Sequence, residues 1–144
     1  MKVKIVNKSN NEIPSHAEPF SAGVDIRAFL SNSLILKPNQ QELIPTGLYI
    51  ELPEQTLGMI TPRSGLSAKF GITITNSPGI IDSSYRGELK IILKNLGTDP
   101  FEIFNGDRIA QLILMNYNKI DFDIVSELSQ TERGEGGFGS TKIK

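Results

Sequence analysis

The sequence predicts an all-β fold whose strands close into a jelly roll or a related β-barrel, with one short helix. Short runs rich in Ile, Val, Leu and Phe recur along the chain with Gly, Pro or Asn between them. Two of these runs, residues 72–75 and 89–94, alternate apolar and polar side chains as half-buried strands do. The chain has 144 residues, 38% of them hydrophobic, which is enough for one core. Many short strands around one core favour a barrel or a two-sheet jelly roll.

The predicted elements follow one another at short intervals. Strands are expected at residues 3–6, 24–29, 34–36, 43–50, 57–61, 72–75, 89–93, 101–104, 108–115 and 122–125. Only residues 64–70 look like a helix, with Ser64 placed to cap its first turn. Asn105 and Gly106 supply turn chemistry before Asp107. These elements are expected to form one domain over residues 1–125.

The sequence changes character after residue 125. From residue 126 to 144 the apolar rhythm stops, and four glycines surround Arg133 and Phe138. Such a segment buries too little apolar surface to order itself, which predicts a flexible C-terminal arm. A terminus that simply remains in solvent is one interpretation. A linker gains nothing from a large ring, however, so an arm that closes over a ligand explains the pattern better, with Phe138 stacking and Arg133 holding phosphate.

Composition excludes several classes of protein. The formal net charge of −1 provides no field to gather nucleic acid or an acidic membrane, so neither partner is expected. The chain has no cysteine, which rules out disulfides and thiolate metal sites, and its polar N-terminus does not resemble a signal peptide. An intracellular, cytoplasmic protein is therefore expected. His16 is the only histidine, so a multi-histidine zinc site is excluded and a Ser-His-Asp triad would depend on this one loop residue.

The segment of residues 79–88 has the layout of a binding hairpin. It places Asp82 behind two isoleucines, at the end of a strand and near a turn, and Tyr85 follows three residues later. An acid in that position can face a ligand above a pocket while the tyrosine closes one side. The alternative is that Asp82 serves only as a hydrogen-bond acceptor in the turn that follows it.

Polar groups that packing does not require occur in four other segments. Asp25 opens one strand, Arg63 and Ser64 open the helix, and Asp107 and Arg108 enter another strand, while the arm is the fourth segment. Taken singly, each segment has an architectural explanation, such as a turn or a structural pairing of Asp107 with Arg108.

The five segments together resemble the five motifs of the homotrimeric dUTP pyrophosphatases (dUTPases). In chain order they read AGVDI, PRSGL, NSPGIIDSSYRGE, GDRIAQL and RGEGGFGST. The resemblance implies a jelly-roll subunit in a homotrimer, with each active site built from three chains and the arm closing over a neighbouring site. It also implies hydrolysis of dUTP to dUMP and pyrophosphate, which keeps uracil out of DNA and supplies dUMP for dTMP synthesis.

The resemblance implies the roles of the hairpin residues. Asp82 matches the base that orients and deprotonates the water attacking the α-phosphorus. Tyr85 matches the aromatic against the deoxyribose, which excludes UTP by clash with its 2′-hydroxyl. Uracil would be read by Asn76, Gly79, Ile80 and Ile81.

The resemblance also implies contacts to the phosphates. The phosphate chain would be bound by Arg63, Ser64 and Gly65, with Gln111 near the α-phosphate. In the arm, Arg133 would pair with the γ-phosphate, and Phe138 with Gly139 would cover uracil. Lys90 is a further candidate for nucleotide contact, a solvated charge being its alternative.

The same family holds Mg²⁺ chiefly through phosphates and water. Asp25 would contact a metal-bound water, or would be purely structural. Two other functions remain open. A deaminase acting on dCTP shares this fold, although the complete arm and the Tyr85 arrangement favour the pyrophosphatase. A regulatory module that senses dUTP and binds a protein partner is the other.

Overall fold

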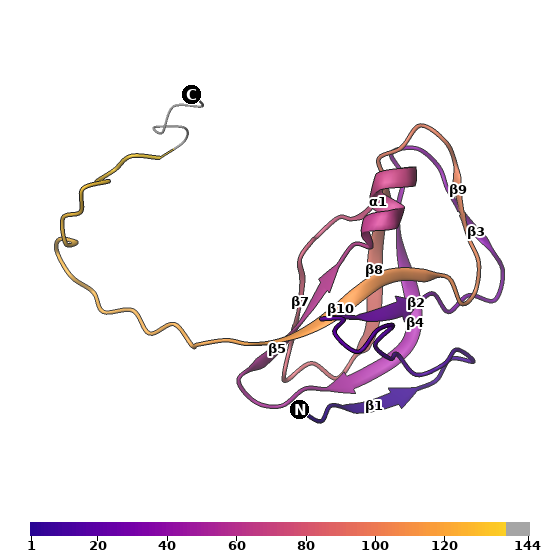
Figure 1. The fold of residues 1–144 in the computed structure, drawn as a ribbon, viewed down its shortest axis with the longest axis horizontal. Helices are drawn as coiled ribbons and strands as arrows, with labels where there is room; N and C mark the ends of the chain where they lie inside the picture. The colour runs from indigo at the N-terminus through magenta and orange to yellow at the C-terminus, as the bar shows by residue number, and fades with distance from the viewer. Residues whose placement is uncertain (138–144) are drawn as a thin grey trace.

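Two four-stranded antiparallel sheets face each other in the computed structural model, which describes residues 1–137 (Figure 1). One sheet has the strand order β1-β4-β8-β6 and the other has the order β2-β10-β5-β7, while β3 and β9 form a separate pair. The elements are β1 (Lys4–Asn7), β2 (Val24–Arg27), β3 (Leu34–Leu36), β4 (Gln41–Glu51), β5 (Thr56–Thr61), α1 (Ser64–Phe70), β6 (Ile72–Ile74), β7 (Gly79–Asp82), β8 (Glu88–Asn95), β9 (Phe101–Ile103) and β10 (Arg108–Asn116). This two-sheet jelly-roll arrangement confirms the predicted fold class.

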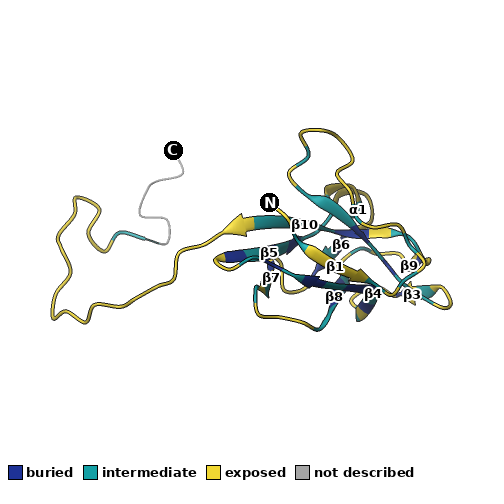
Figure 2. Cartoon of the chain, turned by 90° about the horizontal axis from the view of Figure 1, so that it is seen from below, coloured by how far each residue is buried: buried dark blue, intermediate teal, exposed yellow. Residues whose placement is uncertain are grey.

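The core lies between the sheets because their strands alternate apolar and polar side chains. In β8, Leu89, Ile91 and Leu93 are each about 1% exposed, and the residues between them face outward. Ile60 of β5 and Ile109 of β10 close the core from the second sheet. The buried strand segments are dark blue in Figure 2. Each fully buried Leu or Ile side chain stabilises the fold by about 1.5–3 kcal/mol.

Three polar side chains of the described residues are fully buried, those of Thr46, Thr56 and Asn95. Asn95, at the end of β8, is 0% exposed and its Nδ2 donates to the carbonyls of Leu36 at 2.8 Å and Asp99 at 2.9 Å. Its Oδ1 accepts the backbone N–H of Gly97 at 2.8 Å. All three of these hydrogen bonds are to backbone groups, so Asn95 ties the first sheet to β3.

The bounds predicted for the helix are confirmed, but the predicted cap is wrong. Arg63 is the N-cap, it makes no side-chain cap hydrogen bond, and Ser64 is the first helical residue. The helix ends at Gly71, whose φ of 68° is left-handed. A Cβ there would lie 2.6 Å from the Gly97 nitrogen, so only glycine fits. This stop allows β6 to begin at the next residue, Ile72.

The prediction of a strand at residues 122–125 is wrong. Phe122 is 82% exposed and Ile124 is 94% exposed, and residues 117–137 contain no strand. Alternation alone does not make a strand, because the segment has neither a hydrogen-bonding edge nor an apolar face beside it in this chain. It leads away from both sheets (Figure 1). In the part of the chain that the structure describes, no helix has the length and apolar character needed to cross a membrane.

Candidate active site

The turn between β7 and β8 borders a hollow of about 300 Å³ on the outer face of the sheets. Asp82 is the last residue of β7, and β7 pairs with β5 so that Asp82 lies opposite Leu57. We call this the hairpin hollow. It is lined by Leu43, Asn76, Ile80, Ile81, Asp82, Tyr85, Glu88, Lys90 and Ile92. An acid, an amide, a phenol and an amine thus converge on a partly apolar recess, as in many small-molecule sites.

The Asp82 carboxylate is exposed and available to a ligand. Its backbone carbonyl accepts the N–H of Tyr85 at 3.0 Å, so the backbone closes the turn. Within residues 1–137 no donor binds the Asp82 side chain, which leaves the interpretation of Asp82 as a turn acceptor without support. A carboxylate placed in this way can accept a proton or orient a water.

Tyr85 and Lys90 stand on either side of Glu88. The Tyr85 hydroxyl donates to the Glu88 carbonyl at 3.0 Å, and the ammonium of Lys90 lies 3.6 Å from Glu88 Oε2. Tyr85 is 43% exposed, so its ring forms an open wall of the hollow. Asn76 lies close to Gly79, since a Cβ on Gly79 would be 3.3 Å from Asn76 Nδ2. The predicted hairpin residues are therefore brought together.

A second group of predicted residues forms an arginine cluster of Asp25, Arg63 and Arg108. Arg63 Nε lies 2.9 Å from Asp25 Oδ1, and Arg108 NH1 lies 3.2 Å from Asp25 Oδ2. Arg63 also donates from NH1 to the Arg108 carbonyl at 3.2 Å. Gln111 joins the cluster, because it pairs in register with Asp25 on one side and Thr61 on the other. Two guanidinium groups face one carboxylate, so the cluster keeps a positive charge suited to phosphate.

The neighbours of the arginine cluster differ from the expectations in one respect. Asp107 does not pair with Arg108, because its Oδ2 accepts the backbone N–H of Phe104 at 2.8 Å in the predicted turn. Asp107 is thus a turn residue, and Arg108 belongs to the cluster. Ser64 and Gly65 are exposed beside Arg63, and nothing lies within 4 Å of the space that a Gly65 Cβ would fill. This space leaves the helix start open to a ligand.

The hairpin hollow and the arginine cluster are separate in one chain. Asp82 pairs with Leu57 of β5, whereas the cluster lies beyond Thr61, the opposite end of that strand. Four residues of strand span about 13 Å. Asp25 is further removed, because β10 lies between β2 and β5. The hollow and the cavity beside Arg63 share no lining residue.

Of the arm residues predicted for the site, Arg133 lies in the segment that leads away from both sheets (Figure 1). Arg133 donates from Nε to the Gly136 carbonyl at 2.7 Å, a contact within its own segment. Phe138 and Gly139 lie outside the described residues.

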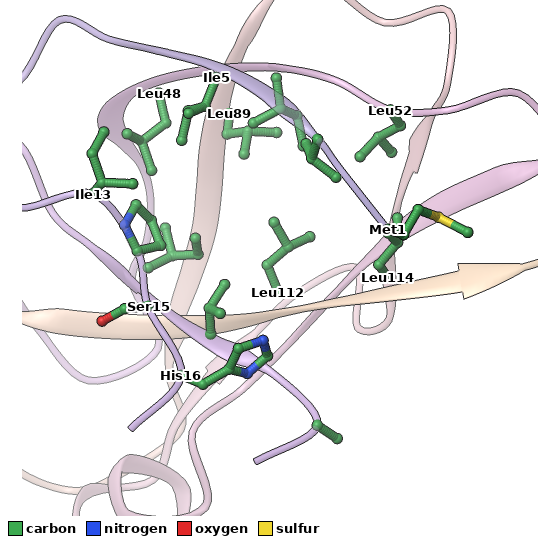
Figure 3. A pocket seen from close by; sticks show the side chains of 16 residues that line it. Met1, Ile5, Ile13, Ser15, His16, Leu48, Leu52, Leu89, Leu112 and Leu114 are labelled. Carbon is green, nitrogen blue, oxygen red and sulfur yellow. The ribbon is translucent and has the colours of Figure 1, made fainter. Parts of the chain in front are cut away.

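A cavity of about 520 Å³, larger than the hairpin hollow, is mostly apolar and is lined in part by His16 (Figure 3). Among residues 1–137 no hydrogen bond joins His16 to a serine or an aspartate, so a triad has no support.

Comparison with known proteins identifies the family. A family model described as dUTPase matches residues 9–142. The chain belongs to the dUTPase family. A deoxyuridine 5′-triphosphate nucleotidohydrolase of Finegoldia magna is 52% identical over 141 residues, covering 98% of this chain and 99% of that protein. The enzyme of the same name from Cytophaga hutchinsonii is 50% identical over 96% of this chain and 90% of its own length.

Solved structures of other dUTPases have the same fold. The dUTPase of Staphylococcus bacteriophage 80alpha, determined with dUPNHPP, has a TM-score of 0.89 at 27% identity and covers 99% of each chain. A D95N variant of the dUTPase of phage phi11 has a TM-score of 0.79 at 24% identity, covers 88% of this chain and 98% of that one, and is described with a structural Mg(II) ion.

The described residues offer few side chains that could hold a metal ion. Within residues 1–137 no three His, Cys, Asp or Glu side chains gather as a metal site. Both oxygens of Asp25 are paired with arginines. Mg²⁺ retains several waters and binds phosphate oxygens readily. This donor set therefore suits an ion bound mainly by a triphosphate and water.

Three residues that line the hairpin hollow of this dUTPase were not predicted from the sequence: Leu43, Ile92 and Glu88. Leu43 and Ile92 pair across β4 and β8 on the outer face. One signal was available, because Ile92 interrupts the polar face that Glu88, Lys90 and Lys94 form on β8. Glu88 had no such signal, since a charged residue at the start of a strand is usual.

Proposed function

We propose that this chain hydrolyses dUTP to dUMP and pyrophosphate. The observation that carries the proposal is the Asp82 carboxylate, which has no protein donor among residues 1–137 and faces a hollow that Asn76 and Tyr85 also line. Membership of the dUTPase family supports the substrate, since relatives covering nearly the whole chain bear the name of that activity. We also propose a division into a jelly roll over residues 1–125 and an arm over residues 126–144, which rests on the change in the sequence after residue 125.

Asp82 would act as the base. Its carboxylate accepts a proton from a water whose oxygen forms a new bond to the α-phosphorus. The bond between the α-phosphorus and the oxygen bridging to the β-phosphorus then breaks, and its electrons leave with pyrophosphate. The exposure of Asp82 at the end of β7 supports this role, because a water can approach the carboxylate without displacing a protein donor.

The remaining hairpin residues would select the nucleoside. Asn76 and the backbone of Gly79, Ile80 and Ile81 would match the polar edge of uracil, leaving donors and acceptors unpaired when cytosine enters. Tyr85 would lie against the deoxyribose and leave no room for a 2′-hydroxyl. Lys90, which shares the hollow with them, would add positive charge near the nucleotide.

The phosphates would be bound by groups that other chains supply. The arginine cluster, which includes Arg63, lies at the far end of β5 from Asp82. Beside this cluster are the other predicted phosphate ligands, Ser64, Gly65 and Gln111. We therefore place the hollow of one chain against the cluster of a neighbour in a trimer. The arm of a third chain would close the site, with Arg133 on the γ-phosphate and Phe138 and Gly139 over the base.

Magnesium would be held by the triphosphate, with Asp25 the residue able to reach a metal-bound water. When bound, the ion would neutralise part of the charge on the phosphate chain. Asp25 also holds Arg63 and Arg108 at 2.9 and 3.2 Å, so it would orient two cations at the same phosphates.

One assay tests the proposed function. Purified protein with Mg²⁺ is incubated separately with dUTP, dCTP, dTTP and UTP, and the release of pyrophosphate and ammonia is measured. We expect pyrophosphate from dUTP alone and no ammonia. Ammonia released from dCTP would identify a deaminase, and the absence of any product with preserved dUTP binding would favour the regulatory module.

A further inference from the structure

The ring of Tyr85 lies directly over Gly87. A Cβ added to Gly87 would meet Tyr85 Cζ at 2.5 Å and Cε2 at 2.9 Å, and the third close atom is the hydroxyl of the same residue. Real Cβ atoms do not approach other atoms so closely. The backbone at Gly87 is not left-handed, so a side chain there has no conformational penalty of that kind. Glycine is thus required at this position only because the Tyr85 ring occupies the space.

The hydroxyl end of the Tyr85 side chain, which lies over Gly87, is also held by a hydrogen bond. Its hydroxyl donates to the carbonyl of Glu88 at 3.0 Å. The Glu88 carboxylate in turn accepts the backbone N–H groups of Gly47 at 2.8 Å and Thr46 at 3.2 Å, where the register of β4 is interrupted. The Thr46 hydroxyl donates to the Leu89 carbonyl at 2.6 Å. This chain of contacts fixes the Glu88 carbonyl, which anchors the Tyr85 hydroxyl.

We propose that Gly87 and Glu88 are positioning residues that determine where the Tyr85 ring stands, and thereby how strictly the enzyme rejects ribonucleoside triphosphates. Gly87 leaves the space for the ring, and Glu88 fixes the acceptor for its hydroxyl. Because that hydroxyl is already bonded within the hairpin, the ring and not the O–H group would face the sugar. The inference rests on the proposed function, in which Tyr85 lies against the deoxyribose.

A single methyl group tests the role of Gly87. In Gly87→Ala the new Cβ pushes against the tip of a flexible side chain, so the Tyr85 ring moves while the backbone stays in place. The ratio of kcat/KM for dUTP to that for UTP should fall about tenfold or more, the scale set by one misfitting group in a pocket. Ser84→Ala is the matched control, because Ser84 is exposed in the same turn and its hydroxyl makes no hydrogen bond within residues 1–137. In Ser84→Ala the ratio of kcat/KM for dUTP to that for UTP should equal that of the parent protein.

A pair of substitutions tests the role of Glu88 without changing the space under the ring. Glu88→Gln retains an oxygen that accepts from Gly47, so discrimination against UTP should stay near that of the parent protein. Glu88→Ala leaves both backbone donors unpaired and should lower the discrimination ratio about tenfold. A merely structural role would lower thermal stability in Glu88→Ala and leave the ratio unchanged.

The outcomes separate this inference from the proposed function. If the parent protein releases no pyrophosphate from dUTP, the proposed function fails. A crystal structure of the Gly87→Ala protein then still tests whether Gly87 determines the position of the Tyr85 ring. A ring in its original position would refute the inference. If the parent protein is active and the Gly87→Ala and Glu88→Ala proteins both reject UTP as it does, the inference is wrong. If the Gly87→Ala protein does not fold, the comparison of Glu88→Gln with Glu88→Ala tests the inference instead.

Discussion

At the scale of single residues, the candidate chemistry depends on how each charge is held. Asp25 is held by two arginines, whereas within residues 1–137 no protein donor binds the carboxylate of Asp82. The two carboxylates are therefore suited to different tasks. A carboxylate engaged by guanidinium groups orients them, and a free one can take a proton from water. Substitution of each acid should separate these tasks.

Replacing the base should affect turnover and spare binding. In Asp82→Asn the amide keeps the size of the side chain but cannot accept the proton, so kcat for dUTP should fall about 10³-fold or more. The dissociation constant measured by calorimetry should change little, because Asp82 is proposed to contact water and not the nucleotide. Near-normal turnover would remove Asp82 from the mechanism.

Asp25→Asn should weaken binding through the arginines. With no charge to hold them, Arg63 and Arg108 lose their ion pairs, and KM for dUTP should rise about tenfold. Steady-state kinetics at several magnesium concentrations distinguish the two roles of Asp25. A higher magnesium concentration at half-maximal rate would indicate a contact with metal-bound water, and an unchanged one would leave Asp25 as an orienting residue. A parent-like KM would contradict the orienting role, and a parent-like KM together with an unchanged magnesium requirement would contradict both roles.

At the scale of elements, the strands depend on buried polar anchors as well as on apolar alternation. Asn95→Ala should lower the free energy of unfolding by about 3 kcal/mol, because three backbone groups lose a partner in a site closed to water. Chemical denaturation at fixed protein concentration measures the change. The exposed Asn118→Ala serves as control. Equal stability of the two variants would show that water replaces the lost bonds.

Sequence patterns were sufficient where a signal is local. The bounds of α1 and β3 and the turn at Asn105–Gly106 were predicted, because periodicity and turn chemistry are properties of neighbouring residues. The failed strand at residues 122–125 shows the limit of that information. A strand is completed by its partners, and alternation does not reveal whether a partner exists in the same chain.

The candidate site was predictable in its members but not in their arrangement. Motif resemblance selected Asp82, Tyr85 and Arg63 and implied a site built from three chains, but it did not indicate whether Asp82 and Arg63 lie close together in one chain. Only the strand register shows Asp82 and Arg63 near opposite ends of β5. The positions of Glu88 and Ile92 in the hollow were also hidden, since both depend on the pairing of β4 with β8.

At the scale of the whole molecule, removal of the arm should separate folding from activity. Every strand in the described residues ends by Asn116, so deletion of residues 131–144 removes none of these strands. We expect a folded trimer that retains little dUTP hydrolysis, as judged by circular dichroism, light scattering and pyrophosphate release. An unfolded product would show that the arm is structural, and full activity would show that the site closes without it.

Sharing of the site between chains can be tested by mixing two inactive proteins. Asp82→Asn removes the base from the hairpin hollow, and Arg63→Ala disables the arginine cluster. If one chain supplied both groups, no mixture of these chains would contain an intact site. If neighbouring chains supply them, random mixing in equal amounts restores both groups in about a quarter of the sites of a cyclic trimer.

The two proteins should therefore be unfolded together, refolded and assayed for pyrophosphate release from dUTP, with each variant refolded alone as control. Recovery of roughly a quarter of the parent rate is expected. A mixture no more active than either variant alone, despite exchange of chains confirmed by mass spectrometry, would mean that Asp82 and Arg63 serve the same chain's site. The separation of the two groups along β5 would then require a conformation in which a single chain brings them together.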